Sequence, residues 1–392
     1  MNIAAPRTQE PHDAMPRISS SAAENNVLAA IGSGRARSRR EIATLLGLSA
    51  STVSQHVQSL IAKELVEEGE SRQSNGGRRA RELRLAGDVG QLGAIDLGGT
   101  HARIGIARRG GGIVATREFP VALADGPEAV LTRIGEELVD LAGGASLAGA
   151  GISLPGPVDA RTQGVINPSR MPGWSGVDVA ALLSEITGAP AVVENDANAM
   201  ALGEHFARAD RPEGTITVKA GTAIGTGIVI AGEVYRGSAG AAGDITHTRV
   251  AAAGDIPCSC GNLGCLETVA SGAALVRLLG ERGVDVSTTA EVVRLVRDGD
   301  PTATPLARAA GRHLGEVLSA IANFFNPGAI YLGGALSSLE PFVSAVRSQI
   351  YEGAHPLITR DLDISPAVLG PDATLVGVSR QVNEQLARRL QG

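Results

Sequence analysis

The chain reads HTRVAAAGDIPCSCGNLGCLE from residue 247 to residue 267, and this segment contains all three of its cysteines. They are Cys258, Cys260 and Cys265, and His247 begins the segment. Thiolate and imidazole groups together suit a closed tetrahedral zinc site, in which four protein ligands leave no position open for a reacting water. A disulfide is disfavoured, because the number of cysteines is odd and Cys258 and Cys260 are separated by only one residue. The alternative to a metal site is three unrelated buried thiols. We therefore expect a structural zinc ion that holds this loop.

The second half of the segment has a motif of its own. Residues 258–267, CSCGNLGCLE, reproduce the pattern CxCGxxGCxE, in which Gly261 and Gly264 allow the backbone to fold back toward one ion. In this motif the chain resembles the ROK family of repressors, open reading frames and sugar kinases, and the resemblance extends from a helix-turn-helix to the C-terminal helix. It implies that Glu267 is a sugar-binding carboxylate, and that zinc holds Glu267 and His247 beside the sugar.

The composition indicates a large α/β protein. With 392 residues, two or three domains and an ample core are expected, and aromatic residues make up only 2% of the chain. No apolar run is long enough to span a membrane, and the polar first 26 residues are unlike a secretory signal. Clustered cysteines suit a reducing compartment, so we expect a cytoplasmic protein with no membrane partner. Residues 1–22 show no apolar periodicity and are predicted to form a disordered arm.

Charge is distributed unevenly along the chain. Residues 1–86 contain twelve basic and nine acidic side chains, whereas the remaining 306 residues contain 23 and 32. A basic N-terminal part on an acidic body indicates that only the N-terminal part meets a polyanion.

Residues 23–86 have the pattern of a winged helix-turn-helix DNA-binding domain. Three helices are predicted, near residues 23–31, 41–46 and 50–60. Ser38 is a suitable N-cap for the second helix, and Gly47 suits the tight turn before the third. The apolar face of the last two helices would consist of Ile42, Leu45, Leu48, Val53, Val57 and Leu60.

Short polar side chains on the third predicted helix could reach base edges and phosphates in the major groove. They are Ser51, Thr52, Ser54, Gln55 and His56. Two wing strands are expected at residues 65–67 and 82–85, and the basic tip between them, residues 76–81, offers Arg78 and Arg79 to phosphates or the minor groove. A solvated helical linker with scattered arginines is the alternative, and the basic wing directly after the helix pair favours DNA.

Three glycine-containing turns follow predicted strands in the body. The turns are at residues 96–100, 221–227 and 333–334, and the strands around them are expected at 92–95, 102–107, 215–219, 228–231 and 330–332. Their order resembles the phosphate 1, phosphate 2 and adenosine loops of the actin-like ATPase (ribonuclease H-like) fold, an approximate duplication of βββαβα lobes. Ordinary turns of an α/β protein are the alternative.

Glycine turns let backbone N–H groups approach phosphate oxygens, so these turns are candidates for binding ATP. The predicted nucleotide-binding residues are Asp96, Gly98, Gly99, Thr100, Gly221, Thr222, Gly225, Gly227, Gly333 and Gly334. Asp96 could hold a Mg²⁺ ion through its water shell. Ala223 stands where the family usually has glycine, and its Cβ could crowd a phosphate.

The segment VVENDAN, residues 192–198, predicts a buried strand that ends in amide and carboxylate groups. Asn195 and Asp196 can bind vicinal hydroxyls, and a desolvated Asp196 could act as the general base of phosphoryl transfer, the role that the resemblance to sugar kinases implies. A helix N-cap is the alternative reading of these residues. Trp174, in the loop at 167–174, could stack on a sugar or pack in the core.

The segment Asp244-Ile245-Thr246-His247 resembles the ExGH motif of the family with two departures. Asp244 replaces the glutamate that would grip the sugar, and Thr246 replaces the glycine. His247 could serve twice, with one ring nitrogen on zinc and the other toward the sugar. The identity of the sugar is therefore open.

These features predict an N-terminal winged helix-turn-helix at 23–86 and a two-lobed ROK domain at 92–392 that contains the zinc loop at 247–267. The first hypothesis is a sugar-responsive repressor that binds an inverted-repeat operator as a homodimer or a dimer of dimers. A second is an ATP-dependent hexose kinase that has a DNA-binding head. A third is a regulator whose signal is a protein or a sugar phosphate.

Overall fold

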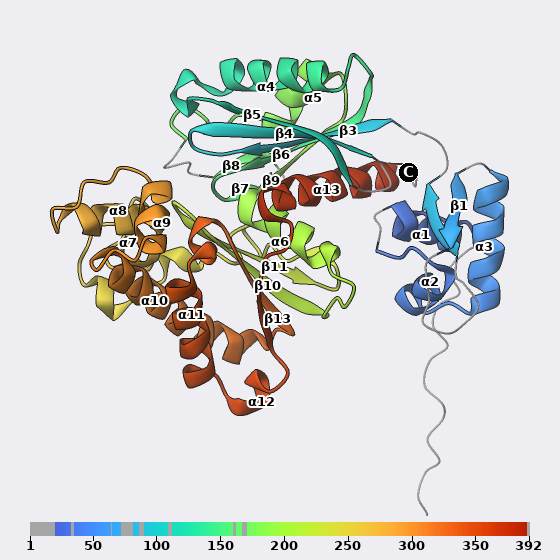
Figure 1. The fold of residues 1–392 in the computed structure, drawn as a ribbon. Helices are drawn as coiled ribbons and strands as arrows, with labels where there is room; N and C mark the ends of the chain where they lie inside the picture. The colour runs from blue at the N-terminus through green and yellow to red at the C-terminus, as the bar shows by residue number, and fades with distance from the viewer. Residues whose placement is uncertain are drawn as a thin grey trace, which may run out of the picture. The chain divides into compact units, whose positions relative to one another are not determined.

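A computed structural model of the chain describes residues 20–32, 35–63, 65–71, 81–85, 90–108, 112–159, 162–166 and 171–389. The chain divides near residue 88 into two compact units. Figure 1 shows the helices and strands of both units, coloured along the chain. Nearly all of the arm expected at residues 1–22 lies outside the described residues.

The N-terminal unit is a winged helix-turn-helix. Its elements are α1 (Ser20–Gly32), α2 (Arg39–Leu46), α3 (Ala50–Ala62), β1 (Val66–Ser71) and β2 (Arg81–Leu85), with the two strands antiparallel. The Ser38 side chain accepts a hydrogen bond from the N–H of Glu41, and the Glu41 carboxylate accepts one from the N–H of Arg37. Gly47 ends α2 with a φ of 63°, in the left-handed region that favours glycine. Local capping therefore sets both ends of α2 as predicted.

Apolar side chains from all three helices and both strands form the core of this unit. They include Val27, Ile42, Val53, Val57, Leu60, Val66 and Leu83. Leu45 was predicted on the buried face, but it is 38% exposed. That prediction was wrong because the face of α2 that packs against the core contains Ile42 and Leu46 instead.

The C-terminal unit contains two five-stranded sheets of the same topology. In chain order, the first consists of β3 (Gln91–Leu97), β4 (His101–Arg108), β5 (Ile113–Pro120), β6 (Leu147–Leu154) and β9 (Ala191–Asn195). The second consists of β10 (Gly214–Ala220), β11 (Ile224–Ile230), β12 (Glu233–Val234), β13 (Ala329–Gly333) and β14 (Asp363–Pro366). The spatial orders are β5-β4-β3-β6-β9 and β12-β11-β10-β13-β14. In each sheet, three antiparallel strands are followed by two parallel ones, which confirms the predicted duplicated fold.

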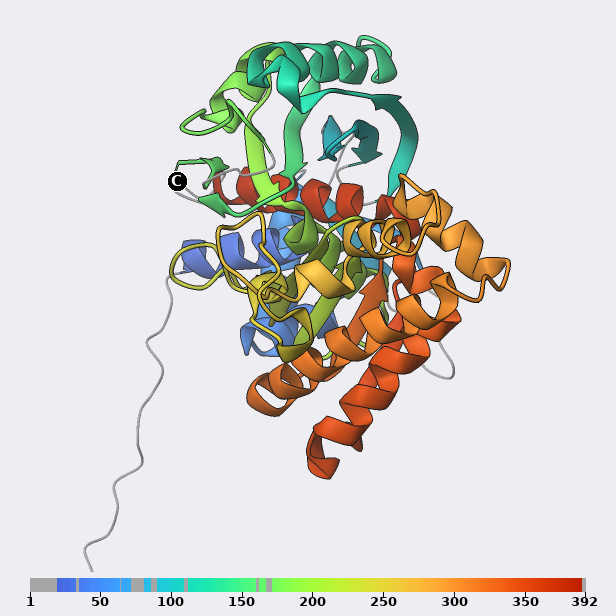
Figure 2. The ribbon, with the colours of Figure 1, turned by 90° about the vertical axis from the view of Figure 1, so that its left-hand side faces the viewer.

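Helices cover both faces of each sheet (Figure 1, Figure 2). The first sheet packs against α4 (Pro127–Leu141) and α5 (Val179–Thr187) on one face and α13 (Ala373–Arg389) on the other. The second packs against α6 (Asp196–Ala207) and, with α10 (Ala303–Phe325) and α11 (Glu340–Gly353), encloses its own core. Shorter elements are β7 (Val158–Asp159), β8 (Gly164–Val165), α7 (Glu267–Ala270), α8 (Gly272–Gly280), α9 (Thr289–Arg297) and α12 (Pro356–Thr359).

Helices α6 and α13 touch through two glycines. A Cβ on Gly377 would lie 1.8 Å from the carbonyl oxygen of Ala199, and a Cβ on Gly203 would lie 2.0 Å from that of Ala373. Any larger residue would push the two helices apart, so the glycines set the distance between the layers.

No helix among the described residues is both long enough and apolar enough to cross a bilayer.

Candidate functional site

The four predicted metal ligands converge. The ligand atoms of His247, Cys258, Cys260 and Cys265 all lie within 4.8 Å of one another. Cys258 Sγ is 3.4 Å from His247 Nδ1, and Cys260 Sγ is 3.7 Å from Cys265 Sγ. Sulfur ligands about 2.3 Å from a tetrahedral zinc stand roughly 3.7 Å from each other. The free thiols and the imidazole therefore fit a zinc ion.

Backbone hydrogen bonds hold the metal loop in this shape. The N–H of Cys258 donates to the carbonyl of Asn262, and the N–H of Gly264 donates to the carbonyl of Ile256, both at 2.9 Å. Gly264 has a φ of 75°, and a Cβ there would lie 2.5 Å from the carbonyl oxygen of Gly254. Only glycine fits this close approach.

His247 faces two neighbours. Its Nδ1 is directed at the cysteine cluster, while its Nε2 lies 3.9 Å from Asp244 Oδ1. Burial raises the pKa of Asp244; His247 opposes this shift and Glu267 adds to it. If His247 binds both the metal and the sugar, it needs one ring nitrogen on each side, and this orientation provides that.

Glu267 begins α7 directly after the metal loop and is buried. Its Oε2 accepts a hydrogen bond from the N–H of Ile224 at 3.2 Å and a short one from the hydroxyl of Thr246. Thr246, at the family's glycine position, thus provides a donor that glycine could not. Sequence reasoning noticed the departure at Thr246 but not its partner, because the two residues are 21 positions apart.

Asn195 caps helix α6. Its Oδ1 accepts from the N–H groups of Ala197 at 3.0 Å and Asn198 at 3.1 Å, and its Nδ2 donates to the carbonyl of Gly156 at 2.8 Å. The N-cap alternative therefore holds for Asn195. Any contact between Asn195 and a sugar would have to use the hydrogen-bonding capacity that this amide has left, such as the second N–H of Nδ2.

Asp196 forms an ion pair that sequence reasoning missed. Its Oδ2 lies 2.7 Å from Nζ of Lys219, which belongs to β10 of the second sheet. Asp96, on β3 of the first sheet, accepts a hydrogen bond from the hydroxyl of Ser153 at 2.8 Å. Burial opposes the charge on Lys219, but the carboxylates of Asp196 and Asp96 outweigh it and raise the pKa of Lys219. The only sequence signal was a single charged residue within a strand of apolar residues and threonines.

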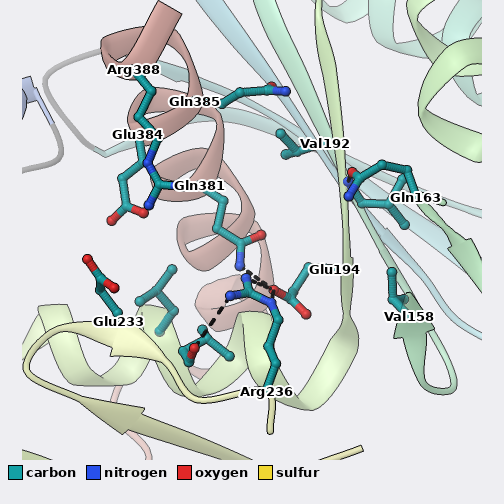
Figure 3. A pocket seen from close by; sticks show the side chains of 13 residues that line it. Val158, Gln163, Val192, Glu194, Glu233, Arg236, Gln381, Glu384, Gln385 and Arg388 are labelled. Carbon is teal, nitrogen blue, oxygen red and sulfur yellow. Dashed lines mark hydrogen bonds and ion pairs between the residues drawn. The ribbon is translucent and has the colours of Figure 1, made fainter. Parts of the chain in front are cut away.

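Glu194, directly before these residues, is the centre of a buried polar cluster. Its Oε1 accepts from the N–H of Asn195 at 2.9 Å and from Nδ2 of Asn198 at 3.1 Å. Its Oε2 accepts from Gln381 Nε2 at 2.5 Å and from the guanidinium of Arg236, and Figure 3 shows both side chains directed at it. These bonds fix the strand end from which Asn195 and Asp196 project.

The same cluster forms one wall of a pocket of about 270 Å³. Val158, Gln163 and Glu233 also line it (Figure 3). Its lining includes none of the five predicted sugar-binding residues. The pocket is therefore separate from the site around Asp196.

Two of the predicted nucleotide turns use their N–H groups internally. The N–H of Gly98 donates to the carbonyl of His101 at 2.9 Å, and that of Gly221 donates to Ala223 at 3.0 Å. The hydroxyl groups of Thr222 and Thr289 share a hydrogen bond at 3.1 Å. Thr100 Oγ1 lies 3.5 Å from His101 Nδ1, which is long for a hydrogen bond. A Cβ on Gly99 would meet no atom within 4 Å, so this position remains open to a ligand.

Four other glycines of the predicted nucleotide set pack against the protein itself. β11 begins at Ile224 rather than at the predicted residue 228, so Gly225 and Gly227 lie within a strand that faces α6. A Cβ on Gly227 would lie 2.4 Å from the carbonyl oxygen of Ala197. In the same way, a Cβ on Gly225 would meet Ala197, one on Gly333 would meet Met200, and one on Gly334 would meet Ala220. Close packing alone therefore explains why glycine stands at these four positions, without any contact to a nucleotide.

Gly227→Ala is expected to destabilise the protein by about 1–3 kcal/mol, because the added methyl group would overlap backbone of α6. Gly99→Ala, the matched change at an open position, is expected to leave the free energy of unfolding nearly unchanged. Denaturant unfolding of both variants checks this. Equal stability of the two would show that the packing reason is wrong.

In the N-terminal unit, the N-terminal half of α3 presents polar side chains. Ser51, Ser54 and Gln55 are exposed, and Thr52 and His56 are half-buried. Ser49 caps α3, and its Oγ also lies 2.7 Å from Oγ1 of Thr52. Among the described residues of the predicted DNA-binding set, Gln55 therefore has the longest exposed side chain.

The predicted basic wing tip lies mostly outside the described residues, and so do Arg78 and Arg79. Arg81, expected in this tip, is instead the first residue of β2 and pairs with Glu68 at 2.8 Å. Residues 167–170 of the predicted aromatic loop also lie outside the described residues. Trp174 is fully buried and donates its indole N–H to the carbonyl of Leu123 at 3.3 Å, so it packs in the core rather than facing a sugar.

Comparisons with known proteins extend over both units. The sequence profile of the ROK family matches residues 92–385, and that of the MarR family matches residues 22–80. A xylose repressor of Bacillus spizizenii is 31% identical over 358 residues, which cover 88% of this chain and 91% of the relative.

Solved structures share the fold. A ROK family transcriptional regulator, a homologue of the E. coli MLC protein, matches with a TM-score of 0.75 and 23% identity over 95% of this chain and 98% of its own. A ROK family glucokinase from Streptomyces griseus, solved with glucose and AMPPNP, matches with a TM-score of 0.66 and 29% identity. That match covers 75% of this chain and 100% of the glucokinase.

Proposed function

The chain belongs to the ROK family, and we propose that it is a sugar-responsive transcriptional repressor. Its winged helix binds operator DNA, and its ROK unit binds a monosaccharide. One observation supports this most: a winged helix precedes the ROK unit, and the match to the xylose repressor of Bacillus spizizenii covers 88% of this chain. A metabolic kinase has no need of such a DNA-binding unit.

The proposed sugar site consists of Asn195, Asp196, Asp244, His247 and Glu267. Sugar hydroxyls both donate and accept hydrogen bonds, and carboxylate, amide and imidazole groups satisfy both needs. A buried polar group left without a partner costs about 1–3 kcal/mol, so the fit of each hydroxyl decides which sugar binds. Because the relative is a xylose repressor, xylose is the first ligand to test.

Two further parts of the proposal concern assembly and metal. We expect a homodimer, or a dimer of dimers, on an inverted-repeat operator in the cytoplasm, because two-fold symmetry matches two recognition helices to two half-sites. We also expect one zinc ion per chain, held by His247, Cys258, Cys260 and Cys265. The ion is structural, since its four protein ligands complete a tetrahedron.

The second candidate function is an ATP-dependent hexose kinase that has a DNA-binding unit. The presence of Asp96, Thr100 and Asp196 favours it. Against it stand Ala223 in the second turn, Asp244 in place of glutamate, and the ion pair between Asp196 and Lys219. The residues around Asp96 and Asp196 do not fit a Mg²⁺ ion, because the Lys219 ammonium already pairs with Asp196 and its charge would repel the cation.

A monosaccharide screen by thermal shift and operator binding tests the sensor function. We expect one sugar, xylose first, to raise the unfolding midpoint and to change operator affinity, because a ligand that binds the native state stabilises it. Asp196→Asn should retain this response in weakened form, since the amide keeps the shape and most hydrogen bonds. Asp285→Asn, at an exposed position, is the matched control.

A coupled assay with ATP, Mg²⁺ and the same sugars separates the two candidates. The sensor should show no turnover near the ordinary kinase rate of about 1–100 per second. Turnover at that rate, with operator affinity insensitive to sugar, would favour the kinase. If no monosaccharide binds and none alters operator affinity, the remaining hypothesis is a protein or sugar-phosphate signal.

A further inference from the structure

Lys219 occupies an unusual position for a charged residue. It lies on β10, the central strand of the second sheet, between Val218 and Ala220, which are both fully buried. Its cross-strand neighbours are Gly225 on β11 and Gly333 on β13. With glycine on both sides, no neighbouring side chain of the sheet competes with the lysine for space.

The lysine reaches across to the first half of the unit. Asp196 stands at the start of α6, directly after β9, and its Oδ2 lies 2.7 Å from Nζ of Lys219. Asp96, at the end of β3, also contributes to the raised pKa of Lys219. The pair is shielded, with the lysine side chain 30% and the aspartate side chain 19% exposed. An ammonium group with a raised pKa stays charged at physiological pH.

We propose that Lys219 is a built-in cation that takes the place of the divalent metal of a sugar kinase. A Mg²⁺ ion is usually held by one or two carboxylates with several waters. Here Asp96 and Asp196 are the carboxylates suited to that role, and the Lys219 ammonium pairs with Asp196 at 2.7 Å and is also attracted by Asp96. A Mg²⁺ ion brought to the same carboxylates would be repelled by the ammonium charge.

The ion pair also fixes the orientation of the Asp196 carboxylate. Its Oδ1 accepts a hydrogen bond from the N–H of Ala197 at 2.8 Å, and its Oδ2 accepts one from Lys219. Each oxygen keeps a second lone pair, which remains available to a sugar hydroxyl. Asp196 therefore serves as a fixed acceptor, and the site holds its shape without nucleotide or metal.

Manganese binding tests this proposal, because Mn²⁺ substitutes for Mg²⁺ and is detected by electron paramagnetic resonance. The zinc-loaded full chain is titrated with Mn²⁺ alone. Lys219→Met should bind Mn²⁺ at this site at least tenfold more tightly than wild type, because the positive charge beside the two carboxylates is removed. Lys219→Gln is the second neutral variant, in case the methionine impairs folding.

Two controls locate the gained binding. Lys219→Arg keeps the charge and should not bind Mn²⁺, and Asp96→Asn added to Lys219→Met should abolish the gain. Mn²⁺ should raise the unfolding midpoint of Lys219→Met but not that of wild type. Wild-type binding as tight as that of the neutral variants would overturn the proposal, and so would folded neutral variants that do not bind. The titration uses neither sugar nor DNA, so its failure is distinguishable from failure of the sensor function.

Discussion

In the Cys260→Ser variant, zinc content is expected to fall well below one ion per chain, because the loss of one thiolate opens the tetrahedral site and weakens zinc binding. Cys260 is exposed, so serine there disturbs no packing and isolates the loss of the metal. Structural zinc in small peptides contributes about 10–16 kcal/mol. Here the core of the second sheet remains, so we expect a smaller loss, seen as a fall in the unfolding midpoint of roughly 5–10 °C.

The same variant should lose its response to sugar. The metal loop leads directly into Glu267, and the ligand His247 faces Asp244. Release of the ion would leave both Glu267 and His247 less firmly positioned, so sugar binding should weaken by more than tenfold. Ser259→Ala, in the same loop and also exposed, is the matched control and should behave as wild type. Metal analysis that finds no zinc in protein prepared without chelator would contradict the assignment.

Gln55→Ala is expected to change which operator sequences are preferred. An exposed glutamine near the start of a recognition helix can form two hydrogen bonds to adenine, and such a contact discriminates by about 1–3 kcal/mol. Affinity for the best operator should therefore fall by about 5- to 150-fold, with little loss on nonspecific DNA. Gln58→Ala, one turn further along α3 and also exposed, is the matched control.

Replacement of Arg78 and Arg79 together by alanine separates phosphate contacts from base contacts. Affinity for all sequences should fall, and the slope of log affinity against log salt should become shallower by about 2, since each lost phosphate contact contributes about 0.9. Fluorescence anisotropy at several salt concentrations measures both effects. Operator binding that survives deletion of residues 1–86 would refute the assignment of DNA binding to this unit.

The winged helix was predictable because its signals are local. The N-cap at Ser38 and the left-handed Gly47 act on backbone within four residues, and the apolar spacing in α3 identifies its buried face. Leu45 shows the limit of this reasoning: it satisfies the spacing, but Leu46 packs against the core in its place.

The glycine pattern was ambiguous for a different reason. A glycine is required both where a phosphate approaches backbone and where another helix does, and the sequence contains the same residue in both cases. The structure distinguishes them, since a Cβ on Gly99 would meet nothing while one on Gly227 would overlap α6.

The sequence by itself determined the winged helix and the family and predicted the cluster of His247 and the three cysteines, because each depends on residues that lie close together along the chain. Only the tertiary structure decided which charged and polar side chains contact each other. Lys219 pairs with Asp196 across two sheets, and Glu194 accepts a hydrogen bond from Gln381, 187 residues later. No local pattern encodes these partners, because they depend on how two separately folded sheets and helix α13 pack against one another.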